Sequence, residues 1–155
     1  MSKVEEIQKW HRQYKIETGI REVDLEAFTE WMVEKGWPLP APITPRERLA
    51  KQCASALRQE TRTDTDTGEP YRVNHMYIVE RDGAQLHLWF DIDEADREPV
   101  TVALNLRREQ TVGDLTQIAR DADHWNRRNP DQEPIVVQLD LTLDVEIRRS
   151  TPADV

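Results

Sequence analysis

Residues 73–92 read VNHMYIVERDGAQLHLWFDI and predict a β-hairpin in the middle of the chain. Asp82-Gly83 is a preferred two-residue hairpin loop, because both residues adopt a positive φ readily. Pairing outward from this loop sends alternate side chains to opposite faces of the hairpin. We expect one face to lie on the core, because it carries Val73, His75, Tyr77, Val79, Leu86, Leu88, Phe90 and Ile92.

The opposite face of the hairpin is half polar, but Met76, Ile78 and Trp89 lie on it together, with His87 opposite Ile78. These side chains make either a second buried surface under a helix or an exposed contact patch. Aromatic and methionine side chains are enriched at protein interfaces. The sequence therefore predicts Met76, Ile78, His87 and Trp89 as partner-binding residues.

Two helices are expected at the start of the chain. Apolar residues at helical spacing over positions 4–14 predict a first helix that ends near Gly19. Asp24 is a good N-cap, and it predicts a second helix that stops at Gly36. The connector WPLPAP at 37–42 has prolines at alternate positions, so we expect it to be extended and stiff.

A third helix is expected directly before the hairpin region. Thr44-Pro45-Arg46-Glu47 combines an N-cap, a proline at the first helical position and a capping-box glutamate. We expect this helix to run to about Arg62 and to place Cys53 on a narrow face of small residues in the core. The composition of residues 64–70 predicts a turn.

The region after the hairpin has two interpretations. Pro99 can open a helix, and apolar residues then follow three- and four-residue steps to about Arg128, so we expect one long helix. The alternation of apolar residues over 100–106, followed by a fresh capping box at 111–114, favours instead a strand and then a helix.

The end of the chain predicts a strand, because every odd position from Ile135 to Ile147 is apolar. A short helix capped by Asp140 or Thr142 is the alternative. The expected fold class is therefore α+β, with three N-terminal helices, a central β-hairpin, a long helix and a C-terminal strand. We expect residues 1–150 to form a single domain and residues 151–155 to be a frayed tail.

Composition limits the compartment and the partners. The net charge of −9 opposes attraction to phosphate backbones and anionic lipids, so nucleic acid is the less favoured partner. A single cysteine allows no intramolecular disulfide, and no apolar segment is long enough for a secretory signal or a membrane span. We expect a cytoplasmic protein without a membrane partner.

No motif identifies a catalytic, metal-binding or cofactor-binding residue, so we predict none of these. The four histidines lack the spacing of a zinc site, and the sequence contains no nucleophile or phosphate-loop motif. The carboxylates of Asp91, Asp93, Glu94 and Asp96 could collect a divalent ion, which keeps a metal-dependent nuclease as an alternative.

The best candidate for a ligand site lies at the mouth of the hairpin. The stretch TGEPYRVNH at 67–75 follows a helix that carries Arg58 and Arg62 toward the same end. Guanidinium groups bind phosphate and carboxylate well, so we predict Arg58, Arg62, Arg72 and Asn74 as ligand-binding residues. The alternative is that these arginines form surface ion pairs with Glu60, Asp64 and Glu69.

Three stretches, WPLP at 37–40, TGEPYRVNH at 67–75 and RREQTVGD at 107–114, resemble a family of uncharacterised bacterial hypothetical proteins. The resemblance covers the chain from the proline connector onward. It favours one long helix after Pro99 and implies no activity, because the family has no assigned function.

The sequence favours a non-enzymatic protein-interaction or regulatory module whose partner is another protein or a second copy of the chain. One alternative is a winged-helix-like DNA-binding protein, with the helix from Pro45 as the reader and the hairpin turn as the wing. That wing tip carries Arg81 between the acidic residues Glu80 and Asp82, whereas a wing needs positive charge to approach phosphates.

Overall fold

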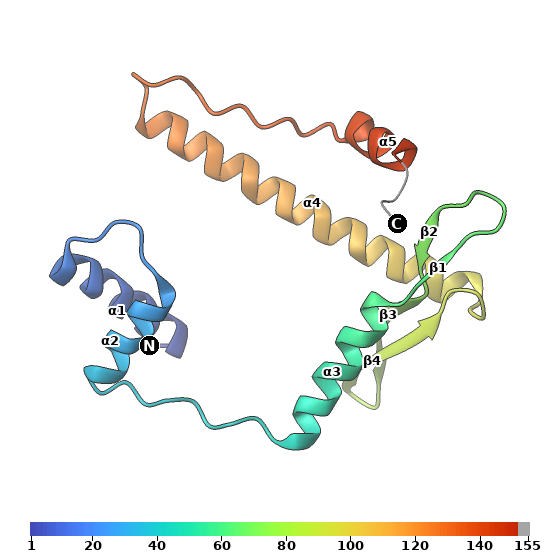
Figure 1. Cartoon of the computed structure of the whole chain (residues 1–155), viewed down its shortest axis with the longest axis horizontal. Helices are drawn as coiled ribbons and strands as arrows, with labels where there is room; N and C mark the ends of the chain where they lie inside the picture. The colour runs from blue at the N-terminus through green and yellow to red at the C-terminus, as the bar shows by residue number, and fades with distance from the viewer. Residues whose placement is uncertain (152–155) are drawn as a thin grey trace. The chain divides into compact units, whose positions relative to one another are not determined.

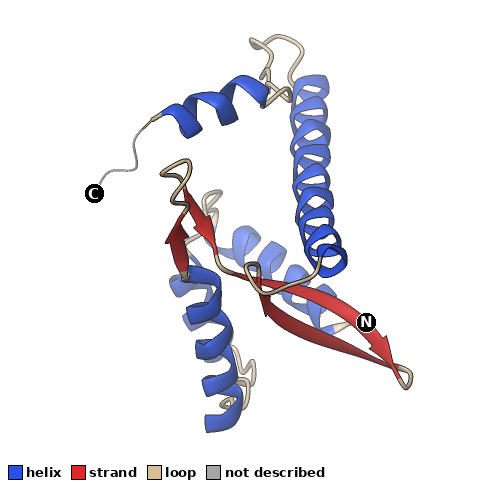
Figure 2. Ribbon diagram, turned by 90° about the vertical axis from the view of Figure 1, so that its right-hand side faces the viewer, coloured by secondary structure: helices blue, strands red, loops and turns tan. Residues whose placement is uncertain are grey.

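The computed structural model describes residues 1–151 and has an α+β fold (Figures 1 and 2). In chain order its elements are α1 (Lys3–Thr18), α2 (Leu25–Glu34), α3 (Pro45–Gln59), β1 (Thr61–Thr63), β2 (Pro70–Arg72), β3 (Asn74–Arg81), β4 (Ala84–Asp91), α4 (Arg97–Arg128) and α5 (Thr142–Ser150). The predicted class, the three N-terminal helices, the central hairpin and the long helix are confirmed.

The chain divides into two compact units, residues 1–48 and the remainder from Leu49 onward. The single domain expected over residues 1–150 stays a prediction. The frayed tail expected at 151–155 lies outside the described residues except for Thr151, whose N–H donates to the Ile147 carbonyl at 3.0 Å.

The first unit is a helical hairpin closed by aromatic side chains. Its core consists of Tyr14, Phe28 and Met32, each 5–6 % exposed, and it is surrounded by half-buried tryptophans. The Trp10 ring lies 5.7 Å from Trp31 in an edge-to-face arrangement, the geometry that aromatic quadrupoles favour. Packing of one aromatic stripe against the other therefore holds α1 and α2 together.

The start of α3 is as predicted, but its end differs. Thr44 Oγ1 accepts from the Glu47 N–H at 3.2 Å, and Glu47 accepts from the Thr44 N–H at 2.8 Å, which confirms the capping box. The helix stops at Gln59 instead of Arg62 because residues 61–63 pair as β1 with β2. The predicted turn at 64–70 closes this small sheet.

Cys53 is exposed, so its predicted place in the core is wrong. The face of small residues on α3 would allow close packing, but none of the residues of this helix is buried. Small side chains allow another element to pack closely against a helix, but they do not ensure that such an element is present.

The β3–β4 hairpin has the predicted register, with Val79 opposite Leu86 and Tyr77 opposite Leu88. Asp82 and Gly83 form the turn with φ values of 53° and 75°, as the two-residue loop requires. Of the predicted core face, Val73 is 1 % exposed and the rest is buried or half-buried.

α4 is one continuous helix of 32 residues, which confirms the preferred interpretation of this region. It packs on β3, and Ala103, at 1 % exposed, is its buried residue. Among residues 1–151, no helix combines the length and the apolar character needed to cross a membrane.

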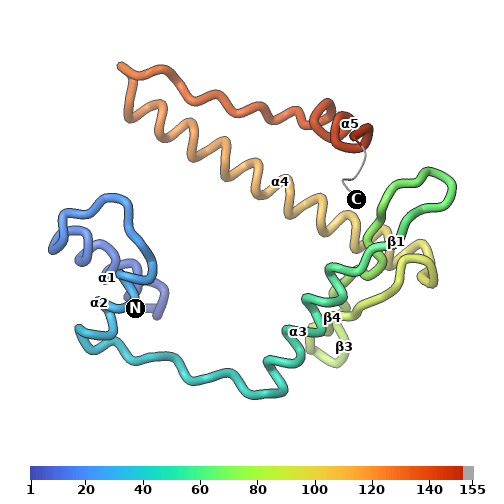
Figure 3. The backbone as a smooth tube through the Cα atoms, viewed as in Figure 1, coloured from blue at the N-terminus to red at the C-terminus, as the bar shows by residue number. Residues whose placement is uncertain are grey.

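The C-terminal strand predicted from Ile135 is wrong. Residues 135–141 return from the end of α4 without pairing as a strand, and they lead into α5 (Figures 1 and 3). The Asn126 side chain takes both the N–H and the carbonyl of Ile135, at 2.8 and 2.9 Å, in place of a neighbouring strand. The alternative of a short helix is the one observed, although its N-cap is Leu141 instead of Asp140 or Thr142. Asp140 accepts from the Thr142 N–H at 3.1 Å.

Candidate functional site

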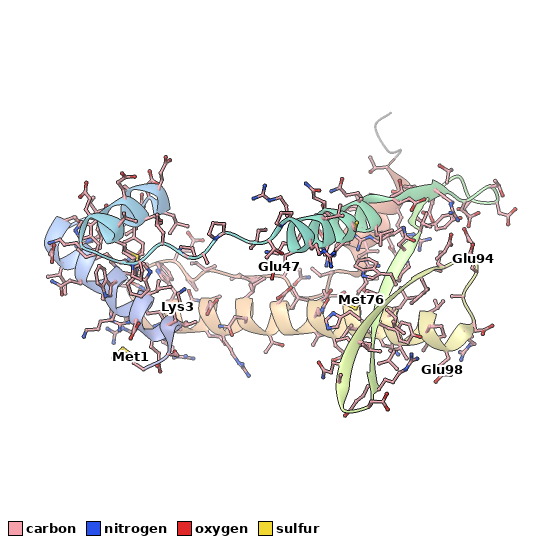
Figure 4. All side chains as sticks on the ribbon, turned by 90° about the horizontal axis from the view of Figure 1, so that it is seen from below. Met1, Lys3, Glu47, Met76, Glu94 and Glu98 are labelled. Carbon is pink, nitrogen blue, oxygen red and sulfur yellow. The ribbon has the colours of Figure 1, made fainter. Side chains whose placement is uncertain are left out.

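A pocket of about 290 Å³ lies in the second unit, where α4 packs on β3 near the end of α3. Its walls include basic and amide side chains from α3, β2, β3 and α4: Arg58, Arg72, Asn74, Arg107 and Gln110. Met76 and Trp89, a cross-strand pair of the hairpin, supply an apolar wall (Met76 is labelled in Figure 4). We call this site the arginine pocket.

The three arginines of the pocket differ from the other arginines of the second unit that bind carboxylates. Among the described residues 1–151, no Asp or Glu forms an ion pair with Arg58, Arg72 or Arg107. Acidic residues outnumber basic ones in this chain, and its net charge is −9. Three guanidinium groups left without a carboxylate in such a chain mark a local concentration of positive charge.

Arg58 is held against an aromatic ring. Its guanidinium carbon lies 5.3 Å from the centre of the Trp89 ring, which is the geometry of a cation–π contact. This contact orients Arg58 without neutralising its charge. The donors of Arg58 therefore remain available at the edge of the pocket.

The pKa of Arg107 is lowered by its surroundings in the pocket. Although its side chain as a whole keeps contact with solvent, partial burial lowers the pKa of the guanidinium, and the positive charge of Arg72 lowers it further. Burial and a like charge both disfavour the charged form of the group. An anion between Arg72 and Arg107 would relieve this repulsion.

Asn74 holds the end of α3 against the hairpin. Its side-chain amide donates to the Leu57 carbonyl at 3.2 Å and to the Glu60 carboxylate at 2.6 Å. The neighbouring Val73 N–H donates to the Glu60 carbonyl at 3.1 Å. Asn74, one of the residues predicted to bind a ligand, lines the pocket, but both of its side-chain N–H groups serve to position α3, and with it Arg58.

His75 supports Arg72 from inside the hairpin. It is 6 % exposed and its ring stacks on Phe90 with centroids 5.9 Å apart. Its Nε2 lies 2.9 Å from the Arg72 carbonyl, and since a carbonyl only accepts, this nitrogen donates. The buried Nδ1 has no hydrogen-bond partner among residues 1–151.

Arg62 lies apart from the other predicted ligand-binding arginines. Its guanidinium binds Asp91 at 2.9 Å and Asp93 at 2.7 Å, and the Tyr71 hydroxyl also donates to Asp93, at 2.8 Å. Hydrogen bonds from Tyr71 and Arg62 lower the pKa of Asp93, while the two carboxylates raise that of Arg62. We call these four residues the Arg62 network.

The expected surface pairings of the arginines are only partly observed. Arg62 reaches Glu60 at 4.0 Å, whereas Glu69 binds Arg149 of α5 through two contacts of 3.2 and 2.9 Å. Arg62 binds Asp91 and Asp93 more closely than the expected partner Glu60 because α3 ends early, which places Arg62 on β1 instead of on the helix.

The predicted partner-binding residues fall into two pairs. Met76 and Trp89 line the arginine pocket, while Ile78 and His87 form the next outward-facing cross-strand pair toward the hairpin turn. Ile78 is 40 % exposed and His87 is exposed. The outer face of the hairpin therefore extends from the pocket to an open, partly apolar surface.

Sequence reasoning missed Arg107 and Gln110. Together with Ala103, they occupy one face of α4 at steps of four and three residues, which is a recognisable helical signal. The sequence gives no indication that this face meets β3, so the residues could not be assigned to the site.

The described residues 1–151 contain no group of three or more His, Cys, Asp or Glu side chains placed to hold a metal ion. Asp91 and Asp93, the carboxylates considered for a divalent ion, bind Arg62. Comparison of the chain with models of protein families, with curated proteins and with solved structures gives no match. The arrangement of side chains therefore carries the functional interpretation.

Proposed function

We propose that this chain is a non-enzymatic binding module that holds an anionic group of a protein partner in the arginine pocket. The observation that carries the proposal is the presence of three arginines around one pocket, none of them in an ion pair within residues 1–151. A planar guanidinium donates two parallel hydrogen bonds to a carboxylate or phosphate, so these groups recognise such an anion directionally.

The surroundings of the pocket suit a partner with both an anionic and an apolar part. Met76 and Trp89 lie beside the arginines, and Ile78 and His87 continue the surface toward the hairpin turn. A central anchor surrounded by apolar and aromatic contacts is a common arrangement at protein interfaces. We expect the partner to insert its anionic group between the arginines and to cover this face.

Isotope-edited NMR titration with a triglutamate peptide tests the proposal, with a triglutamine peptide as the neutral control. We expect the triglutamate peptide alone to shift the backbone amides of Arg72 and Asn74 and the Trp89 indole signal. Shifts spread evenly over all basic surfaces, or none at all, would contradict an anion-binding pocket.

A matched pair of variants separates the pocket from general electrostatics. The Arg72→Gln/Arg107→Gln protein should lose the peptide-induced shifts, whereas Arg81→Gln/Arg108→Gln has the same net charge and should retain them. Arg81 is exposed near the hairpin turn and Arg108 pairs with Glu109 at 2.7 Å, so neither belongs to the pocket. Equal losses in both variants would show that only net charge matters.

Duplex DNA at low salt serves as a rival ligand in the same titration. Binding of DNA that depends on Arg46, Arg48 and Arg58, with a steep salt dependence, would favour the nucleic-acid alternative.

A further inference from the structure

The charge of the arginine pocket indicates which anion it holds. Three guanidinium groups line it, and no carboxylate of residues 1–151 pairs with them. A carboxylate or a phosphodiester carries one negative charge, whereas a phosphate monoester carries about 1.5 to 2 near neutral pH. The monoester therefore leaves the least positive charge uncompensated.

The arrangement of donors leads to the same class of ligand. Arg58 belongs to α3, Arg72 to β2 and Arg107 to α4, so the donors come from three separate elements. A phosphate monoester presents three terminal oxygens around a tetrahedral centre, whereas a carboxylate presents two in one plane. Three arginines on three elements therefore match the three terminal oxygens of a phosphate monoester better than the two oxygens of a carboxylate.

The size and the apolar wall of the pocket define what the phosphate is attached to. A volume of about 290 Å³ lies at the low end of ligand sites, so it suits one phosphate with a small attached group better than a polyanion. Met76, Trp89 and Leu106 offer carbon surface beside the arginines. This wall suits an apolar or aromatic carbon group next to the ester oxygen.

We propose that the arginine pocket selects a dianionic phosphate monoester carried on a small apolar or aromatic group. This inference rests on the proposed anion-binding function and narrows its ligand. The phosphate belongs either to a phosphorylated side chain of a partner protein or to a free small molecule, and the two sources share the chemistry that the pocket recognises.

Phenyl phosphate and phenyl sulfate test the proposal, because both are tetrahedral esters of the same aromatic group but differ in charge. Benzoate supplies the planar carboxylate. We expect calorimetry near pH 7.5 to give phenyl phosphate an affinity at least about tenfold above those of phenyl sulfate and benzoate, because the dianion forms stronger charge-assisted hydrogen bonds with the three guanidinium groups than either monoanion does.

Variants connect this preference to the pocket. Arg107→Gln should reduce the affinity for phenyl phosphate by about tenfold or more, whereas Arg108→Gln, one position along α4, should change it less than about twofold. Arg107→Lys keeps the charge but loses the guanidinium fork, so it should recover only part of the affinity. Equal effects of Arg107→Gln and Arg108→Gln would overturn the assignment.

The outcomes distinguish this inference from the proposed function. Equal affinities for phenyl phosphate, phenyl sulfate and benzoate, all lost in Arg107→Gln, would overturn the phosphate inference and leave the anion-binding function in place. If none of the three binds and the arginine and Trp89 NMR signals do not move, both proposals are wrong.

A second comparison identifies the source of the phosphate. We expect the N-acetyl, C-amide form of phosphotyrosine to bind more tightly than phenyl phosphate if the pocket reads a phosphorylated protein. Tighter binding of phenyl phosphate would identify a small molecule as the source and support the pocket chemistry equally.

Discussion

The Arg62 network and the arginine pocket lie in the same unit and use the same kind of side chain in opposite ways. Arg62 binds the carboxylates of Asp91 and Asp93, whereas Arg58, Arg72 and Arg107 bind no carboxylate among the described residues. The network joins β1 to the end of β4 and so supports the structure. Within residues 1–151 the arginines of the pocket form no ion pair, so their charge is available for the anion that we propose.

Mutations in the Arg62 network and mutations in the arginine pocket should therefore have different effects. Removing a charge from the network breaks existing hydrogen bonds, whereas removing the charge of Arg72 or Arg107 relieves the repulsion between these two residues. Stability and ligand affinity can be measured separately, so the comparison can be tested from both sides.

The largest effect is expected for ligand binding to the Arg72→Gln/Arg107→Gln protein. Loss of two charge-assisted contacts should weaken phenyl phosphate binding by about 100-fold or more. Thermal stability should be unchanged or higher, because burial and the charge of Arg72 already lower the pKa of Arg107. Calorimetry and thermal unfolding of the same samples measure both quantities.

The matched control for this prediction is the Arg81→Gln/Arg108→Gln protein, which should bind phenyl phosphate as the native chain does. A strong loss of stability in the Arg72→Gln/Arg107→Gln protein would mean that these arginines support the structure. The distinction between the two groups would then fail.

The next largest effect is expected for Arg62→Gln, which should lower stability and leave ligand affinity almost unchanged. This change leaves Asp91, whose side chain is only 16 % exposed, without its cation, and it removes one of the two donors to Asp93. We expect the melting temperature to fall by a few degrees and the affinity for phenyl phosphate to stay within about twofold. A loss of affinity well beyond twofold, with little change in the melting temperature, would place Arg62 in the binding site, in agreement with the prediction from the sequence.

The fold was predictable where local chemistry sufficed. Asp82-Gly83 sets the hairpin register, and the Thr44–Glu47 capping box sets the start of α3. Apolar alternation after Ile135 was misleading, because a strand also needs an edge to pair with, and Asn126 takes the hydrogen bonds of Ile135 instead. The three-residue strands β1 and β2 are too short to show a period.

The site was predictable to the extent that its residues are close in sequence. Arg58, Arg72 and Asn74 belong to neighbouring elements, and the structure brings them together in the pocket. Arg107 belongs to α4, and it reaches the pocket only because α4 packs on β3. Arg62 does not line this pocket, because α3 ends at Gln59 and Arg62 belongs to β1 instead of to the helix that carries Arg58.

Acidification should affect the stability of the Arg62 network but not that of the arginine pocket. Hydrogen bonds lower the pKa of Asp93 in the folded protein, so its contribution to stability is present above its ordinary pKa of about 4 and is lost as the pH falls through the lower, folded value. We expect the melting temperature to fall as the pH drops below about 5, and the fall to be shallower in Arg62→Gln. Arg107→Gln should follow the native curve, and a shallower slope there would contradict the distinction.

The smallest effect is expected at the ion pair between Arg149 and Glu69, which resembles the Arg62 network in geometry but is more exposed. Its two contacts measure 3.2 and 2.9 Å, and the side chains are 68 % and 37 % exposed. Solvent screens such a pair, so Arg149→Gln should change the melting temperature by less than Arg62→Gln does.

The local effect of this pair should still be measurable, because it ties α5 to the end of the small β1–β2 sheet. In Arg149→Gln, hydrogen exchange should accelerate in α5 and remain unchanged in β3, since no residue of α5 is buried to hold the helix in place otherwise. A Glu69→Gln/Arg149→Gln double-mutant cycle isolates the pair from its surroundings. A coupling as large as that between Arg62 and Asp91 would show that exposure does not separate the two ion pairs, and that the geometry of the contacts alone determines their strength.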